Sequence, residues 1–320
     1  MTRNPDARWS QEGHSRAALA AAIAIMFVWG ANFGVTKYVL GEMGVGPFLF
    51  IRFLTTPALG FVLLVLVYRR HLAKSWPQRE DVPRFVAVGL IGHTLHVGIV
   101  TWGIDLSTAF SSALVLTSGP LFTLLILAML GVEKLRPRQV AGTAAAFLGI
   151  VLFLSDKFSA GFSRAGIGDL VLLFAAALFS LYTVIAKPLA VRYGPLPLLV
   201  YTLLFGAPPL VLLTLPSVLA APLEKLSWTV WLGMFWAAVV SAFLGWLVWS
   251  WVNAVRGVAR SAPLMYLMPP IAGMVAWLTL GESFSSLKIA GAAVTMAGVA
   301  WAQFGGGRPV PREAAQPDSG

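Results

Sequence analysis

SSALVLTSGPLFTLLILAMLGVEKLRPRQVAGTAAAFLG, residues 111–149, is the stretch that decides the fold, because a related stretch recurs later in the chain. A shift of 149 positions places these residues on the same residue types: Ser112, Ala113, Pro120, Glu133, Gly142 and Gly149. A second match, at an offset of 150, aligns Lys37, Gly44 and Pro47 with the same residue types in the second half. The sequence therefore predicts two structural units that correspond over nearly their whole length.

Pro120 lies near the middle of an apolar segment, 108–130, that is long enough to cross a bilayer. Proline lacks the N–H group that would bond to the carbonyl four residues earlier, and Pro269 occupies the matching position in the second half. Free carbonyls at membrane depth persist only when they are buried in protein or line a wet cavity. Each proline is either a tolerated kink that shapes packing or a helix break beside a central site. The matched positions favour the second interpretation, with Pro120 and Pro269 as candidate helix-break and gating positions.

The composition is that of a membrane protein. Of the 320 residues, 58% are hydrophobic and 11% are charged, and the mean hydropathy is +0.80. The apolar residues fall in blocks of roughly 20, the length that spans about 30 Å of hydrocarbon as a helix. The net charge of +10 does not indicate nucleic-acid binding, because the Lys and Arg residues lie in the short connections between the blocks. The absence of cysteine excludes thiolate chemistry and Cys-ligated metals.

The apolar blocks predict ten transmembrane helices, five in each half. The predicted organisation is a loosely ordered N-terminal segment 1–16, a five-helix repeat 17–154, a linker 155–167, a second five-helix repeat 168–304 and a disordered tail 305–320. Because five is an odd number, the second half enters the membrane from the opposite side, which makes the repeat inverted. Lys and Arg are concentrated in the segments on the side of the N-terminus, so both termini are expected in the cytoplasm.

Few ionisable groups are available for chemistry inside the membrane. The 13 acidic residues lie outside the middles of the predicted spans, which argues against a proton-coupled cation pump. His93 and His96 lie one turn apart near the membrane centre. They are satisfied core imidazoles, hydrogen-bond partners of a substrate, or proton-titrating switches, and as a metal pair they lack further ligands. Arg52, within the second span, is expected to extend its guanidinium outward to the membrane surface.

The segment Trp29-Gly30-Ala31-Asn32-Phe33 lies at mid-depth in the first span. Asn32 needs hydrogen-bond partners there, because an unsatisfied amide in hydrocarbon costs on the order of 2 kcal/mol or more. An interhelical hydrogen bond would meet this need, but its repeat counterpart is Tyr182, so an opposed amide and aromatic pair could also hold a flat, polar-ended ligand. Trp102, Trp246 and Tyr266 are candidate aromatic walls, with packing or lipid anchoring as the alternative.

The ten-span inverted repeat, the Trp29–Phe33 segment, and the Pro269–Glu282 span followed by Gly291 and Gly298 resemble the drug/metabolite transporter superfamily, EamA type. The resemblance covers roughly residues 17–304, and in detail the chain is similar to the bacterial aromatic amino-acid exporters. It implies two bundles around a central cavity, with the last span of each half at the periphery, and export by alternating access. By matching position, the implied cavity-facing residues are Trp29, Asn32, Phe33, His93, His96, Trp102, Ser112, Tyr182, Trp246 and Tyr266.

These observations predict an exporter, in the bacterial inner membrane, of amino acids and related metabolites, with aromatic or bulky neutral amino acids as the expected substrates. The expected mechanism is facilitated alternating access without a cofactor or metal, and the resemblance implies that a monomer is functionally sufficient. Small-molecule substrates and the bilayer are the expected partners, and nucleic acid is not. The alternative is a broad-specificity drug or metabolite efflux carrier, possibly proton-coupled. An intramembrane enzyme would need a nucleophile–base or metal constellation, and a passive channel would lack saturation and counterflow.

Overall fold

The computed structural model describes residues 5–69, 75–131, 136–158, 164–256 and 262–304. Within these ranges the chain is helical and contains no strand. Eight of the helical segments are long and apolar enough to cross a membrane, and two shorter apolar helices, Leu264–Leu280 and Ser286–Ala302, follow them. The apolar blocks thus form helices as predicted, because a helix satisfies its own backbone hydrogen bonds in lipid. The protein is a multi-pass membrane protein.

The helices of the first half are α1 (Pro5–Met43), α2 (Val45–Tyr68), α3 (Val82–Gly89), η2 (Leu90–Val97), α4 (Gly98–Leu106), α5 (Ala109–Thr117), α6 (Gly119–Met129) and α7 (Pro137–Phe158). Those of the second half are α8 (Arg164–Tyr193), α9 (Pro195–Ala220), η3 (Leu223–Lys225), α10 (Trp228–Phe235), η4 (Trp236–Leu244), α11 (Gly245–Arg256), η5 (Ala262–Leu267), α13 (Met268–Leu280) and α14 (Ser286–Phe304). The segments α3, η2 and α4 follow one another as a single span, as do α10, η4 and α11.

The ends of the two halves differ from the prediction. The N-terminal segment 1–16 was expected to be loosely ordered, but α1 begins at Pro5 and runs without a break to Met43. Proline suits the first turn of a helix, and the Ala, Arg, Gln and Glu residues that follow it favour helix. The linker is also shorter than the predicted 155–167, because α7 continues to Phe158 and α8 begins at Arg164. The expected disorder of 305–320 lies outside the described residues.

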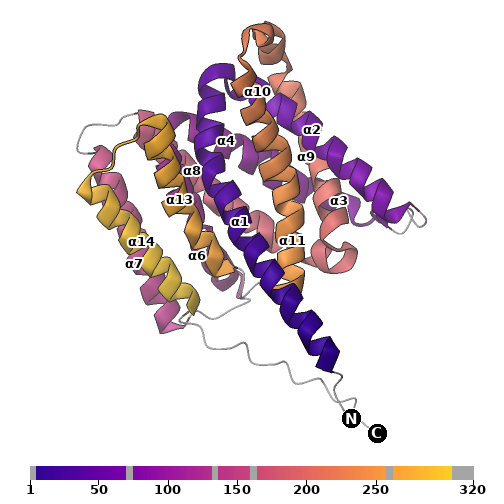
Figure 1. Cartoon of the computed structure of the whole chain (residues 1–320), viewed down its shortest axis with the longest axis horizontal. Coiled ribbons are helices and arrows are strands. Elements are labelled where there is room, and N and C mark those ends of the chain that lie inside the picture. Colours follow the sequence, from indigo (N-terminus) through magenta and orange to yellow (C-terminus); the bar gives the residue numbers. More distant parts are fainter. Residues whose placement is uncertain (1–4, 70–74, 132–135, 159–163, 257–261, 305–320) are drawn as a thin grey trace.

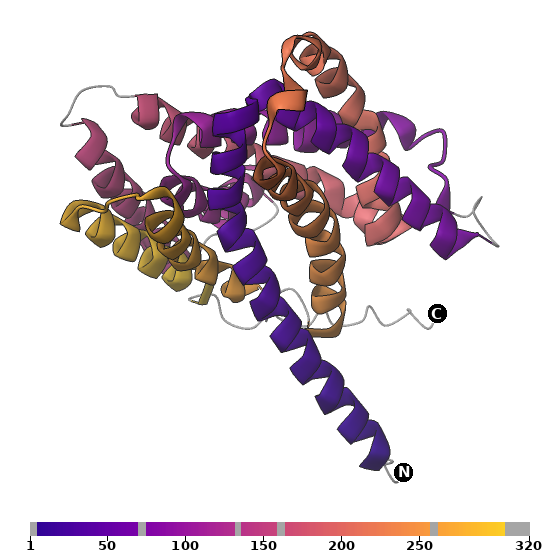
Figure 2. The same ribbon diagram turned by 45° about the horizontal axis from the view of Figure 1, so that its top comes forward.

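The arrangement places α1 in the middle of the bundle, in contact with α13, α11, α10, η4 and α5 (Figure 1). Helices α7 and α14, the last of each half, lie side by side at one edge, and α2, α3 and α9 form the opposite edge (Figures 1 and 2). The α7–α14 pair is close because glycines let the backbones meet. A Cβ atom on Gly298 would lie 2.4 Å from the backbone nitrogen of Ala146.

The two halves share local backbone features at matched positions. Gly44 and Gly194 have φ values of 80° and 81°, and Gly131 and Gly281 have φ values of 67° and 65°. Each pair is separated by the repeat offset of 150, and each residue lies in the left-handed region that favours glycine at a helix end. The contacts also follow the repeat, since η2 packs against α8 and α9 while η4 packs against α1 and α2. The third span of each half therefore contacts the first two spans of the other half.

Candidate functional site

The third span of each half contains one π-helical segment, η2 in the first half and η4 in the second. π-helices are rare and occur frequently at functional sites, because the wider turn displaces side chains and disturbs the hydrogen-bond ladder. In this protein η2 carries both intramembrane histidines, and η4 contacts the aromatic residues of α1. Sequence analysis did not predict these segments, and no residue pattern in the chain marks them.

His93 is buried at the junction of η2, α8 and α9. Its Nε2 atom lies 3.0 Å from the hydroxyl oxygen of Thr202 in α9. Its ring meets that of Tyr182 in α8 edge to face, with 5.8 Å between the ring centroids. The adjacent Thr94 donates a hydrogen bond of 2.6 Å to the carbonyl of Gly206 in α9. These contacts hold His93 against the second half of the protein.

His96, one turn along, is partly exposed and points to the same side. Its Nδ1 lies 2.9 Å from the carbonyl oxygen of Ala175 in α8, so Nδ1 is the nitrogen that carries the proton. The ring also lies 5.1 Å from that of Phe179. The structure thus brings His93, His96 and Tyr182 together as one group, together with Phe179 and Thr202, which sequence analysis had not assigned to the cavity.

A second group forms around Trp29 of α1. Its indole Nε1 donates a 3.0 Å hydrogen bond to the carbonyl oxygen of Ser241 in η4. Its ring lies 6.4 Å from that of Trp246 and 5.6 Å from that of Trp249. A donor on α1 therefore satisfies a carbonyl of the π-helix, and the predicted pair Trp29 and Trp246 lies together. Because Phe179 is the repeat counterpart of Trp29, the two groups occupy matched positions in the two halves.

Several buried polar atoms have no hydrogen-bond partner within the described ranges. They include Asn32 Oδ1 and Thr36 Oγ1 of α1, Trp236 Nε1 of η4 and Tyr266 OH of η5. A buried polar group without a partner is costly, so such atoms are normally satisfied by water or a ligand. Asn32 and Thr36 are one turn apart on α1, which places an unpaired amide oxygen and an unpaired hydroxyl on one face of this helix.

Within the described ranges, no hydrogen bond or ring contact joins the other predicted residues to either group. Phe33 packs against a hydrophobic core cluster that contains Leu40 and Val115. Trp102 is 50% exposed. Ser112 is completely buried and donates a 2.7 Å hydrogen bond to the carbonyl of Thr108 in its own helix region. Tyr266 packs against a separate cluster formed by Leu121, Ala146, Val299 and Ala302.

Both prolines lie beside an interruption in a span. Helix α5 ends at Thr117 and α6 begins at Gly119, so the interruption precedes Pro120. The hydroxyl of Ser180 in α8 donates a 2.7 Å hydrogen bond to the carbonyl of Gly119. A side chain of the second half thus satisfies a backbone acceptor at the interruption in the first half. Pro269 lies in the first turn of α13, directly after the 3₁₀ segment η5. Their role in gating stays a prediction.

Arg52 was expected to extend to the membrane surface, and this expectation is wrong. It lies on the buried face of α2, with Phe48 one turn before it and Thr56 one turn after it, both buried. Its guanidinium carbon is 6.0 Å from the centroid of the Phe48 ring. The helix face, and not the length of the side chain, decides its direction. The sequence signal was available, because residues 48, 52 and 56 follow helical spacing.

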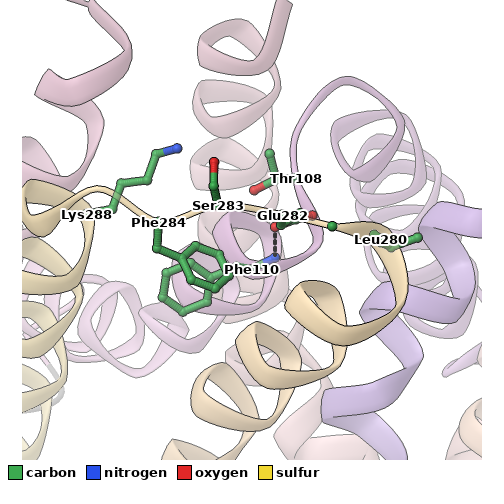
Figure 3. Close-up of a pocket in the computed structure, with 8 residues that line it drawn as sticks. Thr108, Phe110, Leu280, Glu282, Ser283, Phe284 and Lys288 are labelled. Carbon is green, nitrogen blue, oxygen red and sulfur yellow. Dashed lines mark hydrogen bonds between the residues drawn. The ribbon is translucent and has the colours of Figure 1, made fainter.

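Glu282 connects the two halves at the end of α13 (Figure 3). Its carboxylate accepts hydrogen bonds from the backbone nitrogens of Ala109 at 2.7 Å and Phe110 at 3.4 Å. These groups are unsatisfied donors at the start of α5, so Glu282 caps that helix. The Phe110 and Phe284 rings lie 4.8 Å apart beside a cavity of about 370 Å³. The repeat counterpart Glu133 lies outside the described residues.

The profile of the EamA-like transporter family matches residues 16–155 and 166–303, so the chain belongs to this family. It is 28% identical over 286 residues to a "Probable terminal-alkyne amino-acid exporter" of Streptantibioticus cattleyicolor, covering 88% of this chain and 92% of that protein. It is 27% identical over 301 residues to a "Probable amino-acid metabolite efflux pump" of Salmonella typhimurium, covering 89% and 94%. A solved crystal structure matches with a TM-score of 0.59 at 20% identity, covering 90% of this chain and 97% of that chain, which shows a shared fold. The protein is therefore a membrane transporter of the EamA type.

Proposed function

We propose that this transporter exports amino acids, with aromatic or bulky neutral amino acids as its main substrates, across a bacterial inner membrane. The observation that carries this proposal is the pair of aromatic groups at matched positions, one with Trp29 and Trp246 and one with Phe179 and Tyr182. A flat side chain fits between aromatic faces. The relatives named as exporters of amino acids or their metabolites support the substrate class.

We further propose ten spans arranged as two inverted repeats around a central cavity. The two shorter apolar helices would complete the ten, with η5 and α13 forming one interrupted span. The matched left-handed glycines, the paired π-helices and the reciprocal contacts of η2 and η4 support this arrangement. With both termini in the cytoplasm, as the distribution of Lys and Arg favours, the Tyr193 end of α8 would face the cytoplasm.

In this mechanism the substrate binds between the halves and is released when they rock relative to one another. Polar ends of the amino acid need polar partners in the site. His96 and the unpaired Asn32 Oδ1 are the groups that we assign to this role, because each has hydrogen-bonding capacity that the described residues leave unused. Transport would follow the substrate gradient, since the middles of the spans carry no carboxylate to exchange a proton.

Counterflow in liposomes tests the proposal. Vesicles containing the purified protein are preloaded with unlabelled phenylalanine, and labelled phenylalanine is added outside without a pH gradient. We expect transient accumulation of label that saturates and is competed by tryptophan and tyrosine. Accumulation only under an imposed pH gradient would contradict the facilitated mechanism, and competition by lipophilic drugs but not by amino acids would favour a broad-specificity efflux carrier.

A further inference from the structure

Arg52 presents a problem that the fold alone does not explain. A charged side chain within a membrane span is costly, and such residues normally face the protein interior and pair with another charge. Arginine keeps its proton under nearly all conditions, so it does not lose its charge by deprotonation when it is buried. A positive charge held among α-helices in the membrane therefore needs a negative or strongly polar partner.

Arg52 lies on the face of α2 that is turned toward the other helices. Its guanidinium lies over the ring of Phe48, which is completely buried, and Thr56 one turn later is buried as well. Arg52 itself is partly exposed. An ionisable residue on the inner face of a span is a candidate for binding a polar part of the substrate.

Within the described ranges, no carboxylate or other hydrogen-bond acceptor meets the guanidinium, and its described partner is the face of the Phe48 ring. The ion pairs seen elsewhere in the described ranges, those of Arg84, Arg164 and Arg192, lie at the ends of the spans. The histidines of η2 supply no negative charge in either protonation state. The sequence has no acidic residue in the middle of a span to fill this role.

The internal repeat points to the same place. The counterpart of Arg52, at an offset of 150, is Thr202, and Thr202 contacts His93 at 3.0 Å. Helices α2 and α9, which carry the two repeat mates, pack along each other, and η2 packs against α9. Arg52 and Thr202 therefore lie on neighbouring helices at the same edge of the bundle.

We propose that Arg52 binds the carboxylate of the transported molecule and thereby restricts transport to substrates that carry one. Guanidinium and carboxylate groups match in a two-point, charge-assisted geometry, which gives direction as well as affinity. The substrate then supplies the negative charge that the spans lack. Lipophilic amines would leave Arg52 unpaired and add a second positive charge, so they are excluded. This inference rests on the proposed export of amino acids, but it requires only that the substrate is an acid.

Chemical protection of the full-length wild-type protein tests the inference. Phenylglyoxal, which modifies accessible arginines, is added to the purified protein, and modification at each arginine is followed by mass spectrometry of peptides. We expect Arg52 to react, and phenylalanine and 3-phenylpropionate each to slow its modification at least fivefold. Phenethylamine, which has the ring and the amine but no carboxylate, should not slow it. Arg69, exposed just after the end of the same helix, is the internal control and should react equally under all conditions.

The outcomes separate this inference from the proposed function. Protection by 3-phenylpropionate without protection by phenylalanine would support Arg52 as a carboxylate anchor and count against amino acids as substrates. Protection by neither acid, equal protection by phenethylamine, or an Arg52 that does not react would overturn the inference.

Variants give a second, independent reading. Arg52→Gln should reduce phenylalanine counterflow at least tenfold, and Arg52→Lys, which keeps the charge but loses the two-point geometry, should retain more of it. Arg69→Gln is the matched control and should transport like the wild type. Transport by Arg52→Gln at the wild-type rate would overturn the inference. If Arg52→Gln does not fold, the protection experiment still decides it.

Discussion

Two junctions between the halves occupy matched positions in the repeat but are built from different chemistry. One joins the end of α8 to the segment before α3, and the other joins the end of α1 to the segment before α10. At the first, Arg192 donates hydrogen bonds to Asp81 at 2.6 Å and to Glu80 at 2.9 Å, and also to Gln78. The hydroxyl of Tyr193 donates to Asp81 at 2.6 Å. We call this the charged junction.

The second junction is mainly apolar. A hydrogen bond of 2.9 Å joins the hydroxyls of Tyr38 and Thr229, and Val39 and Val230 belong to one hydrophobic core cluster. Val230, in the first turn of α10, and Asp81, directly before α3, are equally enclosed, with exposed fractions of 0% and 1%. We call this the apolar junction. The buried residue is thus a carboxylate at one junction and a valine at the other.

The difference predicts how each junction opens. Hydrogen bonds to a buried carboxylate are directional, so they are lost together when the helices separate. At an apolar contact, the stabilising free energy falls in proportion to the apolar area that becomes exposed. Removing one partner of a buried ion pair costs about 3–5 kcal/mol, and an exposed pair contributes about 0–1 kcal/mol. Asp81 therefore dominates the charged junction, and the exposed Glu80 adds little.

The largest expected effect is that of Asp81→Ala. Arg192 and Tyr193 lose their shared acceptor, so we expect a larger loss of stability here than at the apolar junction, although Arg192 is itself 42% exposed and can be solvated after the change. The measurement is thermal unfolding of the purified protein together with phenylalanine counterflow. The matched control is Val230→Ala at the apolar junction, which should cost about 1 kcal/mol. Equal effects of the two substitutions would contradict the distinction between the junctions.

A smaller effect is expected for Gly233→Ala at the apolar junction. The new Cβ atom would lie 2.5 Å from Cγ2 of Val39, and overpacking of this kind costs about 1–3 kcal/mol. Thermal unfolding should show this loss. The double variant Gly233→Ala with Val39→Ala should regain part of it, because the smaller side chain removes the clash. A double variant less stable than both single variants would show that the contact is not the cause.

The smallest effect is expected for Glu80→Gln. The Arg192–Glu80 pair is largely exposed, so its loss should cost less than about 1 kcal/mol, and the difference from wild type should shrink at high salt. Unfolding temperatures measured at low and high ionic strength test this. A loss as large as that of Asp81→Ala, unaffected by salt, would place the energy of the junction in Glu80 and not in Asp81.

The fold was predictable where local chemistry determines it. The apolar run at 47–68 predicted a span that the structure places at Val45–Tyr68, because an apolar block in lipid has few alternatives to helix. The transporter family was also predicted correctly. The pairing of Arg192 with Asp81 was not, since the residues are far apart in sequence and no periodic pattern links them. The π-helices depend on packing between the halves, which hydropathy does not report.

Some residues of the candidate site could be predicted from residue type and repeat position, and others could not. His93, His96 and Tyr182 were selected from residue type and repeat position, and they lie together. Trp102 and Ser112 were selected on the same grounds, and within the described ranges no hydrogen bond or ring contact joins them to either group. Helix rotation decides which side of a span faces inward. Sequence alone gave no measure of that rotation for an apolar helix with little contrast between its faces.

The alternating access proposed above, with the two junctions opening in turn, is tested most directly by the accessibility of matched single cysteines. The protein has no cysteine, so Val39→Cys and Leu189→Cys give probes without background, and the two positions are repeat counterparts that are both buried in the structure. Asp81→Ala, added to each, should speed maleimide labelling at Leu189→Cys and slow it at Val39→Cys. Labelling that rises at both positions, or changes at Leu189→Cys alone, would indicate local loosening and contradict alternating access.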